Sequence, residues 1–407
     1  MSDTPRLPVL VTGGAGYIGS HTAVALYEAG FLPVLLDNLH NSSLQTVEGV
    51  KTLCGADVPF AQVDVCDREA LSSVFEQHSS EDAPFAGILH FAAHKAVGES
   101  VAHPAMYASN NVGGLGTLLE VAESHGVRNV VFSSSCTVYG EPETVPVNED
   151  APFQHAESPY GWTKQASERV LADHAATHPA HRVALLRYFN PVGAHPSAAI
   201  GELPLGVPNN LVPFLTQAAA GIRGTLTVFG GDYPTADGTC IRDYLHVMDL
   251  AEAHVSALQW CLAQDSEAHV VRAFNLGTGQ GASVLEVIKA FERATGETVP
   301  HTMGDRRAGD VVAIWADPSR AEKELGWSAK RSLETSMADA WRWQQALKTR
   351  LSTPSGPPRE ILFTPALGCG PSIANGSTPQ VPRPGSRPTA TVSPTTDLSS
   401  PRGGRPP

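Results

Sequence analysis

The sequence predicts an α/β fold, in which a doubly wound parallel sheet is followed by a smaller C-terminal domain and a disordered tail. Apolar segments of strand length alternate with amphipathic segments of helix length up to about residue 190. This alternation is typical of a parallel sheet with helices on both faces. Beyond residue 190, proline- and glycine-rich loops join shorter helices, which indicates a second domain. From about residue 352 proline, serine, threonine, glycine and arginine dominate, and such a segment buries too little apolar surface to fold.

The predicted strands are short apolar runs bounded by turn residues. They lie at 7–12, 32–37, 59–63, 87–92, 129–134 and 183–189, and the run 273–276 returns to the same sheet. The helices show apolar residues at helical spacing near 17–29, 67–78, 104–125 and 159–176, then around 211–221, 249–263 and 283–295. Residues 1–190 therefore form the first domain (with the sheet return near 270–279), residues 191–347 the second, and residues 348–407 the tail.

Composition restricts the class of function. The chain has 407 residues, 42% of them hydrophobic, and a formal net charge of −13, which disfavours nucleic acid or an anionic membrane as the main partner. No apolar run reaches the roughly 18 residues of a membrane-spanning helix, and residues 1–8 are too short and polar for a signal peptide. We therefore expect a cytoplasmic protein. The six cysteines form no C-x-x-C pair and are expected to be reduced.

A glycine-rich segment follows the first predicted strand. Gly13, Gly16 and Gly19 lie between this strand and the first predicted helix. In such a strand–turn–helix unit the glycines allow a tight turn and a close approach of main-chain N–H groups to a dinucleotide pyrophosphate. Asp37 ends the second predicted strand, where a carboxylate can accept a hydrogen bond from a ribose 2′-hydroxyl and so favours NAD over NADP. The first domain is thus predicted to be a Rossmann-type NAD-binding domain.

Three further residues form a candidate catalytic set. Ser158 and Pro159 are typical of a helix start, and Tyr160 and Lys164 then lie one turn apart on the same helix face. An ammonium group close to a phenol lowers the phenol pKa from its usual value of about 10, so Tyr160 is a candidate general base. Ser135 follows the fifth strand, whose carboxyl end opens onto the ligand crevice of a doubly wound sheet.

The sequence predicts no metal ligand. His90 and His94 have the spacing of a helical metal-binding pair, but His90 lies within the predicted strand 87–92. At that spacing a strand does not bring two imidazole rings together.

With these motifs in order along the chain, residues 7–345 resemble the UDP-glucose 4-epimerase (UDP-galactose 4-epimerase) family of extended short-chain dehydrogenases/reductases. The most specific segments are 11–22, 36–39, 94–100, 133–140, 186–196, 208–211, 242–250, 306–310 and 315–317. The resemblance implies a tightly held NAD, a homodimer formed through helices near 104–125 and 159–176, and UDP-glucose and UDP-galactose as substrates. It also implies the reaction, a reversible inversion at C4 of the sugar through a transient 4-keto intermediate.

The resemblance also implies the residues that contact each ligand. For NAD these are Gly13, Gly16, Tyr17, Ile18 and Gly19 at the pyrophosphate, Asp37, Asn38, Asn41 and Ser42 at the adenosine ribose, Asp64 and Val65 at the adenine, and Phe91, Lys95, Asn110, Ser135, Tyr160, Lys164 and Phe189 towards the nicotinamide. For the UDP-sugar they are Ser135 and Tyr160 at the hexose, Asn190, Asn210 and Leu211 at the diphosphate and uridine, Thr227, Val228 and Phe229 at the uracil, and Arg242, Arg307 and Asp310 at the phosphates and ribose.

Alternative functions remain open at this stage. A nucleotide-sugar 4,6-dehydratase needs an acid–base pair where this chain has Cys136 and Thr137, so dehydration is disfavoured. An epimerase with a preference for UDP-N-acetylglucosamine or a uronate, or a non-catalytic dinucleotide-sensing module, would share the same fold. Ile314 stands where many bacterial relatives have a tyrosine beside the sugar C2 substituent, which leaves the acceptance of N-acetylated sugars open. The tail is either a basic interaction segment or a dispensable extension.

Overall fold

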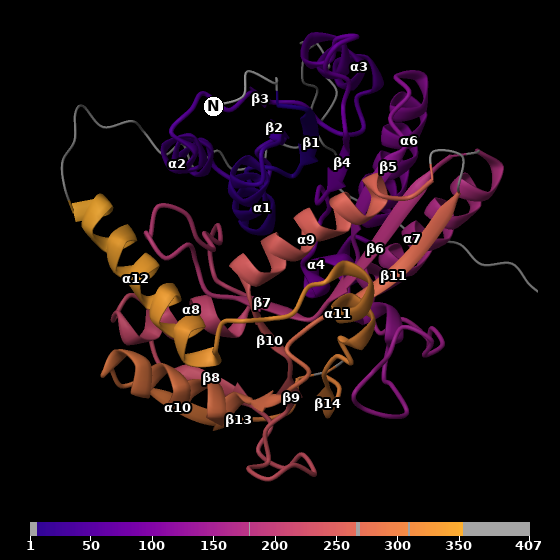
Figure 1. Ribbon diagram of the computed structural model, residues 1–407. Coiled ribbons are helices and arrows are strands. Elements are labelled where there is room, and N and C mark those ends of the chain that lie inside the picture. The colour runs from indigo at the N-terminus through magenta and orange to yellow at the C-terminus, as the bar shows by residue number, and fades with distance from the viewer. Residues whose placement is uncertain (1–5, 179, 266–268, 308–309, 353–407) are drawn as a thin grey trace, which may run out of the picture. The chain divides into compact units, whose positions relative to one another are not determined.

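Seven parallel strands form the central sheet in the order β11-β6-β5-β4-β1-β2-β3 (Figure 1). Their bounds are β1 Pro8–Thr12, β2 Leu32–Leu36, β3 Phe60–Ala61, β4 Gly87–His90, β5 Asn129–Ser133, β6 Arg182–Tyr188 and β11 Val270–Leu276. The structure is a computed structural model that describes residues 6–352 except 179, 266–268 and 308–309. The strand order reverses between β1 and β4, the switch point at which doubly wound sheets bind ligands. The predicted α/β fold with a parallel sheet is confirmed.

Helices cover both faces of this sheet because its strands are apolar on both sides. On one face α1 (Tyr17–Glu28), α2 (Leu44–Cys54) and α9 (Val247–Leu262) contribute to the same apolar core. On the other face lie α3 (Arg68–His78), α6 (Gly114–Ser124) and α7 (Pro159–Thr177). Helix α9 packs on the sheet although its residues lie within the range predicted for the second domain.

A second core forms among elements from the C-terminal half. Helices α8 (Leu211–Ala219), α10 (Val284–Thr295) and α12 (Leu333–Ser352) surround the parallel pair β8 (Leu226–Phe229) and β13 (His301–Gly304). The short strands β9 (Ile241–Arg242), β12 (Ala282–Ser283) and β14 (Ala313–Ile314) form a small sheet, and β7 (Asn190–Val192) pairs with β10 (Tyr244–His246). Helix α11 (Ser319–Leu325) returns to the main core.

The helix predicted near 104–125 is confirmed as one helical run over 104–124, but it contains a π-helical turn. It consists of α5 (Pro104–Tyr107), the π-helical turn η1 (Ala108–Gly113) and α6, and the short helix α4 (Val97–Ala102) precedes it. Proline favours the first turn of a helix and interrupts the one before it. Within η1, the Asn111 amide accepts a hydrogen bond from the His94 N–H at 2.8 Å and donates one to its carbonyl at 3.0 Å. These bonds hold the turn against the loop after β4.

The first five residues of the predicted tail are helical. Helix α12 continues to Ser352, so residues 348–352 are helical. The Arg350 guanidinium donates a hydrogen bond to the Ala198 carbonyl at 2.9 Å and lies 5.3 Å from the centre of a Trp343 ring, which fixes this last turn. Residues 353–407 of the predicted tail lie outside the described residues.

Two further properties concern the part of the chain that the structure describes. Its cysteines, at positions 54, 66, 136, 240 and 261, are free thiols, and the sixth cysteine lies in the segment outside it. Among its helices, none has the length and apolar character that a membrane crossing requires.

Candidate active site

The glycine-rich loop lies at the carboxyl end of β1, where it turns into α1. Gly13 has a φ of +70°, and a Cβ atom at this position would lie 2.8 Å from the Ala92 nitrogen. A Cβ atom on Gly19 would lie 2.3 Å from the Gly13 carbonyl oxygen. Gly16 precedes α1, and no side chain caps this helix N-terminus. The loop is therefore packed so closely that only glycine fits at positions 13 and 19. The uncapped N-terminus of α1 is suited to bind an anion.

The side chains of the next two residues point into the protein. The Tyr17 hydroxyl donates a hydrogen bond to the Gly193 carbonyl at 2.7 Å, and Ile18 packs against the main core. Burial raises the pKa of Tyr17 well above its ordinary value, and the charge of Glu202 adds to this effect. If these two residues contact a pyrophosphate, they therefore do so through their main-chain N–H groups.

Asp37 organises the adjacent loop from the end of β2. Its carboxylate accepts hydrogen bonds from the Ala15 N–H at 3.1 Å, from the Leu39 N–H at 2.9 Å and from the Ser42 hydroxyl at 2.7 Å. The side chain is buried, and its bond to Ala15 links it to the glycine-rich loop. The structure thus brings together Asp37, Ser42 and the glycine-rich loop.

A second pair extends this end of the site. The Asn38 amide donates a hydrogen bond to Asp64 at 2.9 Å. Burial raises the pKa of Asp64, but the hydrogen bonds from the Cys66 N–H and from Asn38 outweigh it, so the net pKa lies below its ordinary value. Asn41 is exposed in the same loop, and the Val65 side chain is buried in the core. Val65 can therefore contact a ligand only at its edge or through its main chain.

The three predicted catalytic residues converge. Ser158 caps α7 by accepting a hydrogen bond from the Gly161 N–H at 3.1 Å, which sets the start of the helix that carries Tyr160 and Lys164. Ser135, just beyond β5, hydrogen-bonds the Tyr160 side chain. The Lys164 ammonium lies 5.9 Å from the centre of the Tyr160 ring.

The predicted lowering of the Tyr160 pKa by Lys164 is wrong for the protein alone. Tyr160 is half-buried as a whole residue, but desolvation of its side chain raises its pKa to about 12, against the opposing effect of the Ser135 hydrogen bond. The Lys164 ammonium donates to the Ser133 carbonyl at 2.6 Å instead of reaching the phenol oxygen. Burial lowers the pKa of Lys164 to about 8, although the Glu168 carboxylate raises it.

Sequence reasoning missed the charged network behind Lys164. Glu168 accepts two hydrogen bonds from Arg187, at 3.0 Å from Nε and 2.7 Å from Nη2, and also one from Ser134. Both charged side chains are almost fully buried. The spacing of Glu168, one helical turn beyond Lys164, is a signal that could have found the carboxylate. Nothing in the sequence indicates that Arg187 is the partner of Glu168.

Several of the predicted substrate residues gather around one carboxylate. Asp310 Oδ1 lies 2.8 Å from Arg307 Nη2 and 3.7 Å from Arg242 Nη2. The Arg307 guanidinium also lies 5.9 Å from the centre of the Phe229 ring. In β8, Thr227 and Phe229 are exposed, whereas Val228 is buried in the second core. The side chain of Val228 is thus not available to line a uracil pocket, as strands alternate their faces.

Glu202 links residues predicted for the two ligands. Its Oε1 atom lies 3.7 Å from Lys95 Nζ and accepts a hydrogen bond from the Asn210 amide at 2.7 Å. Lys95 was expected on the NAD side and Asn210 on the nucleotide-sugar side, so Glu202 contacts one residue expected on each side. Leu211 follows as the first residue of α8. Sequence reasoning missed Glu202 because it lies in an irregular segment without a motif.

The remaining predicted residues lie on the elements around this centre. The Phe91 ring is 4.7 Å from that of His254, and Asn110 donates a hydrogen bond to Asn111 at 2.8 Å. Asn190 begins β7, and its N–H donates to the Asp243 carbonyl at 2.9 Å. Phe189 and Ile314 are buried in one small apolar cluster.

The fold and this site define an NAD-type dehydrogenase/reductase of the short-chain class. A sequence profile of the family described as GDP-mannose 4,6 dehydratase matches residues 10–340. The UDP-glucose 4-epimerase of Bacillus subtilis (strain 168) is 52% identical over 340 residues, which cover 84% of this chain and 97% of that one. The UDP-glucose 4-epimerase of Dictyostelium discoideum is 48% identical over 336 residues, which cover 83% and 95%.

Solved structures agree with these sequence matches. The UDP-glucose 4-epimerase from Stenotrophomonas maltophila, crystallised with NAD and formylated UDP-arabinopyranose, superimposes with a TM-score of 0.81 at 47% identity, covering 85% of this chain and 100% of that one. The enzyme from Bifidobacterium longum, in complex with NAD⁺ and UDP, gives a TM-score of 0.78 at 43% identity, covering 83% and 98%. The chain belongs to the UDP-glucose 4-epimerase family.

Proposed function

We propose that the protein interconverts UDP-glucose and UDP-galactose by inverting C4 of the hexose, with NAD as a tightly held cofactor. The observation that carries this proposal is the convergence of Ser135, Tyr160 and Lys164 near the carboxyl end of β5. Similarity to UDP-glucose 4-epimerases crystallised with NAD supports it.

The residues of this chain fit a dinucleotide. The glycine-rich loop packs so closely that a Cβ atom on Gly13 or Gly19 would meet main-chain atoms, and α1 begins without a side-chain cap. Main-chain N–H groups at such a helix start bind phosphate. Asp37 and Asn38 would hold the adenosine end, and Lys164 the nicotinamide ribose. When bound, NAD supplies a reversible hydride acceptor.

The roles of the side chains follow from their chemistry. Tyr160, as phenolate, would remove the proton of the sugar 4-hydroxyl, and Ser135 would donate a hydrogen bond to the reacting oxygen. NAD, when bound, would accept the C4 hydride and return it to the opposite face of the ketone, which would invert C4. With a pKa of about 12 in the protein alone, Tyr160 needs a nearby positive charge to become a base near neutral pH. The Lys164 ammonium and, when NAD is bound, the oxidised nicotinamide ring would supply this charge.

The nucleotide end provides the anchor. Arg242 and Arg307 are planar, permanently charged groups that bind phosphate oxygens bidentately, and they overcome the unfavourable field of an acidic chain. Their shared contact with Asp310 holds both guanidinium groups in place before a ligand arrives. Strong binding of the diphosphate allows the hexose to turn within the site.

Substitution of the catalytic pair tests the proposal. Purified Tyr160→Phe and Lys164→Met variants should lose most turnover of UDP-galactose, measured as formation of UDP-glucose. The parallel readout is absorbance of reduced nicotinamide after UDP-sugar is added without further cofactor. Near wild-type turnover in both variants would contradict the assignment.

Ile314 favours a second substrate class. This buried side chain packs in the same cluster as Phe189, and isoleucine leaves more room than a tyrosine would. N-acetylated UDP-hexosamines are therefore proposed as additional substrates. Incubation with UDP-galactose and UDP-N-acetylgalactosamine side by side checks this, and a complete lack of epimer from the second sugar would exclude it.

We also propose that the protein is a cytoplasmic homodimer that uses α7 and the segment before α6. Exposed apolar side chains on these elements support the proposal, since Val101 is 64%, Met106 37% and Trp162 50% exposed. Light scattering during size-exclusion chromatography should give twice the chain mass. The Trp162→Glu variant should shift towards the monomer.

A further inference from the structure

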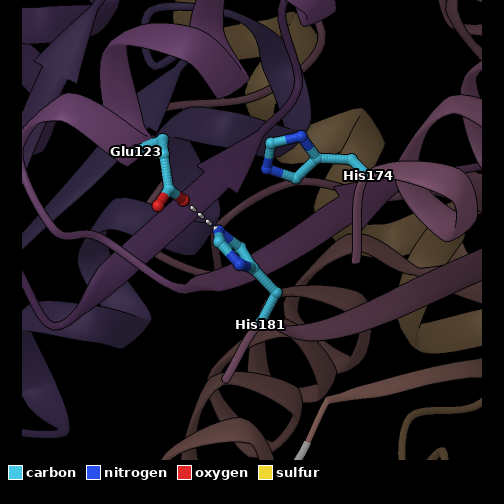
Figure 2. Close-up of side chains that lie close together, drawn as sticks. All are labelled: Glu123, His174 and His181. Atoms are coloured by element: carbon cyan, nitrogen blue, oxygen red, sulfur yellow. Dashed lines mark ion pairs between the residues drawn. The ribbon is translucent and has the colours of Figure 1, made fainter. Parts of the chain in front are cut away.

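Three side chains with metal-binding atoms meet at the end of α7 that lies away from the proposed active site (Figure 2). Glu123 is in the last turn of α6, His174 is near the end of α7, and His181 directly precedes β6. One ligand atom from each residue lies within 4.8 Å of the other two. Tyr160 and His174 are 14 residues apart on one helix, which corresponds to about 21 Å.

The chemistry of the donor set is that of a transition-metal site. Two imidazole nitrogens and one carboxylate oxygen are ligands that Zn²⁺ and similar divalent ions use, with a fourth position left for water. In Figure 2 the two rings and the carboxylate point towards a common centre. The three residues come from separate elements, so the arrangement is fixed by tertiary packing and not by a local turn.

The His181 ring is held in the orientation of a metal ligand. Its Nδ1 atom lies 3.1 Å from the His178 carbonyl oxygen. A carbonyl oxygen only accepts, so Nδ1 carries the hydrogen, and Nε2 of the neutral ring presents a lone pair. A backbone carbonyl that fixes the tautomer in this way is the usual partner of a metal-binding histidine.

The atoms that face the centre lack other partners. His181 Nε2 lies 3.0 Å from Glu123 Oε2 and forms an ion pair with it when the ring is protonated (Figure 2), and apart from this pair the buried oxygen has no hydrogen bond. His174 Nε2 is also buried without a hydrogen-bond partner. Buried polar atoms are nearly always satisfied, and a cation between these three atoms would satisfy them together.

Neighbouring charges both favour and oppose a cation here. Burial lowers the pKa of His174 and of His181, which keeps their rings in the neutral form that binds metals. Glu123 supplies negative charge, whereas Arg128 acts on His181 with a positive charge. The His178 ring stacks on His174 with 4.1 Å between ring centres and supports its position.

We propose that Glu123, His174 and His181 bind one divalent transition-metal ion of the zinc type. The ion joins the ends of α6 and α7 to the start of β6 and so stabilises α7, the helix that carries Tyr160. This site is independent of the proposed function, because none of its residues belongs to the set assigned to NAD or the UDP-sugar.

Direct metal binding tests the site on the untagged, full-length protein as purified with its cofactor. After treatment with a chelator and its removal, the protein is titrated with Zn²⁺ in a calorimeter and with Co²⁺ in a spectrophotometer. We expect one saturable site per chain, a visible Co²⁺ spectrum of low coordination number and a melting temperature that rises with Zn²⁺ and falls again with chelator.

Matched variants locate the binding. His174→Gln and His181→Gln should weaken Zn²⁺ binding by about tenfold or more and remove the Co²⁺ spectrum. The exposed His301 lies on β13, and His301→Gln should leave both unchanged. If a histidine variant fails to fold, Glu123→Gln, with the same shape and no charge, replaces it. Absence of saturable binding by the wild-type protein, or equal binding by all variants, would overturn the proposal.

Discussion

Glu168 and Arg187 form a buried, bidentate ion pair one helical turn behind Lys164. The Arg187 guanidinium donates to the two carboxylate oxygens at 3.0 Å and 2.7 Å, and it also contacts the Tyr139 hydroxyl at 3.0 Å. The Glu168 charge raises the pKa of Lys164, against the larger effect of burial. The pair therefore connects β6, which carries Arg187, to a carboxylate that affects the protonation of the proposed catalytic Lys164.

Removal of one partner of this pair should be costly. Glu168→Gln leaves the Arg187 charge buried without compensation, and we expect a loss of about 3–5 kcal/mol in the free energy of unfolding. Urea unfolding measures this loss. The control is the double substitution Glu168→Leu with Arg187→Met, which removes both charges. If the double variant is as unstable as the single one, packing and not an unpaired charge is the cause.

Lys164 should make stability depend on pH in a specific direction. Its pKa is lowered from 10.5 to about 8 in the folded protein, so between these values the unfolded chain binds more protons. Stability contributed by this group therefore rises as pH increases from 8 to 10.5, and below pH 8 its burial is fully destabilising. Relative to the Lys164→Met variant, the free energy of unfolding of the wild-type protein should rise by about 3 kcal/mol across this pH range. A flat difference between the two unfolding curves would contradict a lowered pKa.

Tyr160 should change its protonation when the cofactor binds. Burial holds its pKa at about 12 in the protein alone, and a cation beside the phenol favours the phenolate. Ultraviolet difference spectra of NAD-loaded and NAD-free protein should show a phenolate band at lower pH in the loaded form. The Tyr160→Phe variant should lack this band. Identical titrations of the two forms would show that the proposed base is not activated by the cofactor.

Some of these features could be predicted from the sequence and others could not. The strand periodicity, the glycines at 13, 16 and 19 and the pair Tyr160 and Lys164 are local patterns, so β1, α1 and α7 were predicted within a few residues. The raised pKa of Tyr160 depends on desolvation, which sequence spacing does not report. The cluster of Glu123, His174 and His181 exists only after two helices and a strand have packed together.

The π-helical turn within the predicted helix and the helical start of the predicted tail have the same explanation. Asn111 holds the π-helical turn through two hydrogen bonds to His94, which is distant in sequence. The last turn of α12 is fixed by Arg350 on the carbonyl of Ala198, a contact that no local propensity indicates. In both cases tertiary hydrogen bonds stabilise a conformation that the local sequence pattern does not indicate.

The close packing of the glycine-rich loop provides the most direct test of the dinucleotide site. A methyl group at position 19 would lie 2.3 Å from the Gly13 carbonyl oxygen, so Gly19→Ala must displace the loop or the start of α1. We expect loss of bound NAD, measured by cofactor release on denaturation, and a lower melting temperature. Gly116 in α6 has no neighbour within 4 Å of its Cβ position, so Gly116→Ala should stabilise the protein by about 0.5–1 kcal/mol and leave NAD content unchanged. The two variants add the same methyl group, at position 116 in open space and at position 19 where there is no room for it. Full NAD occupancy in the Gly19→Ala variant would therefore show that binding of the cofactor does not depend on this loop.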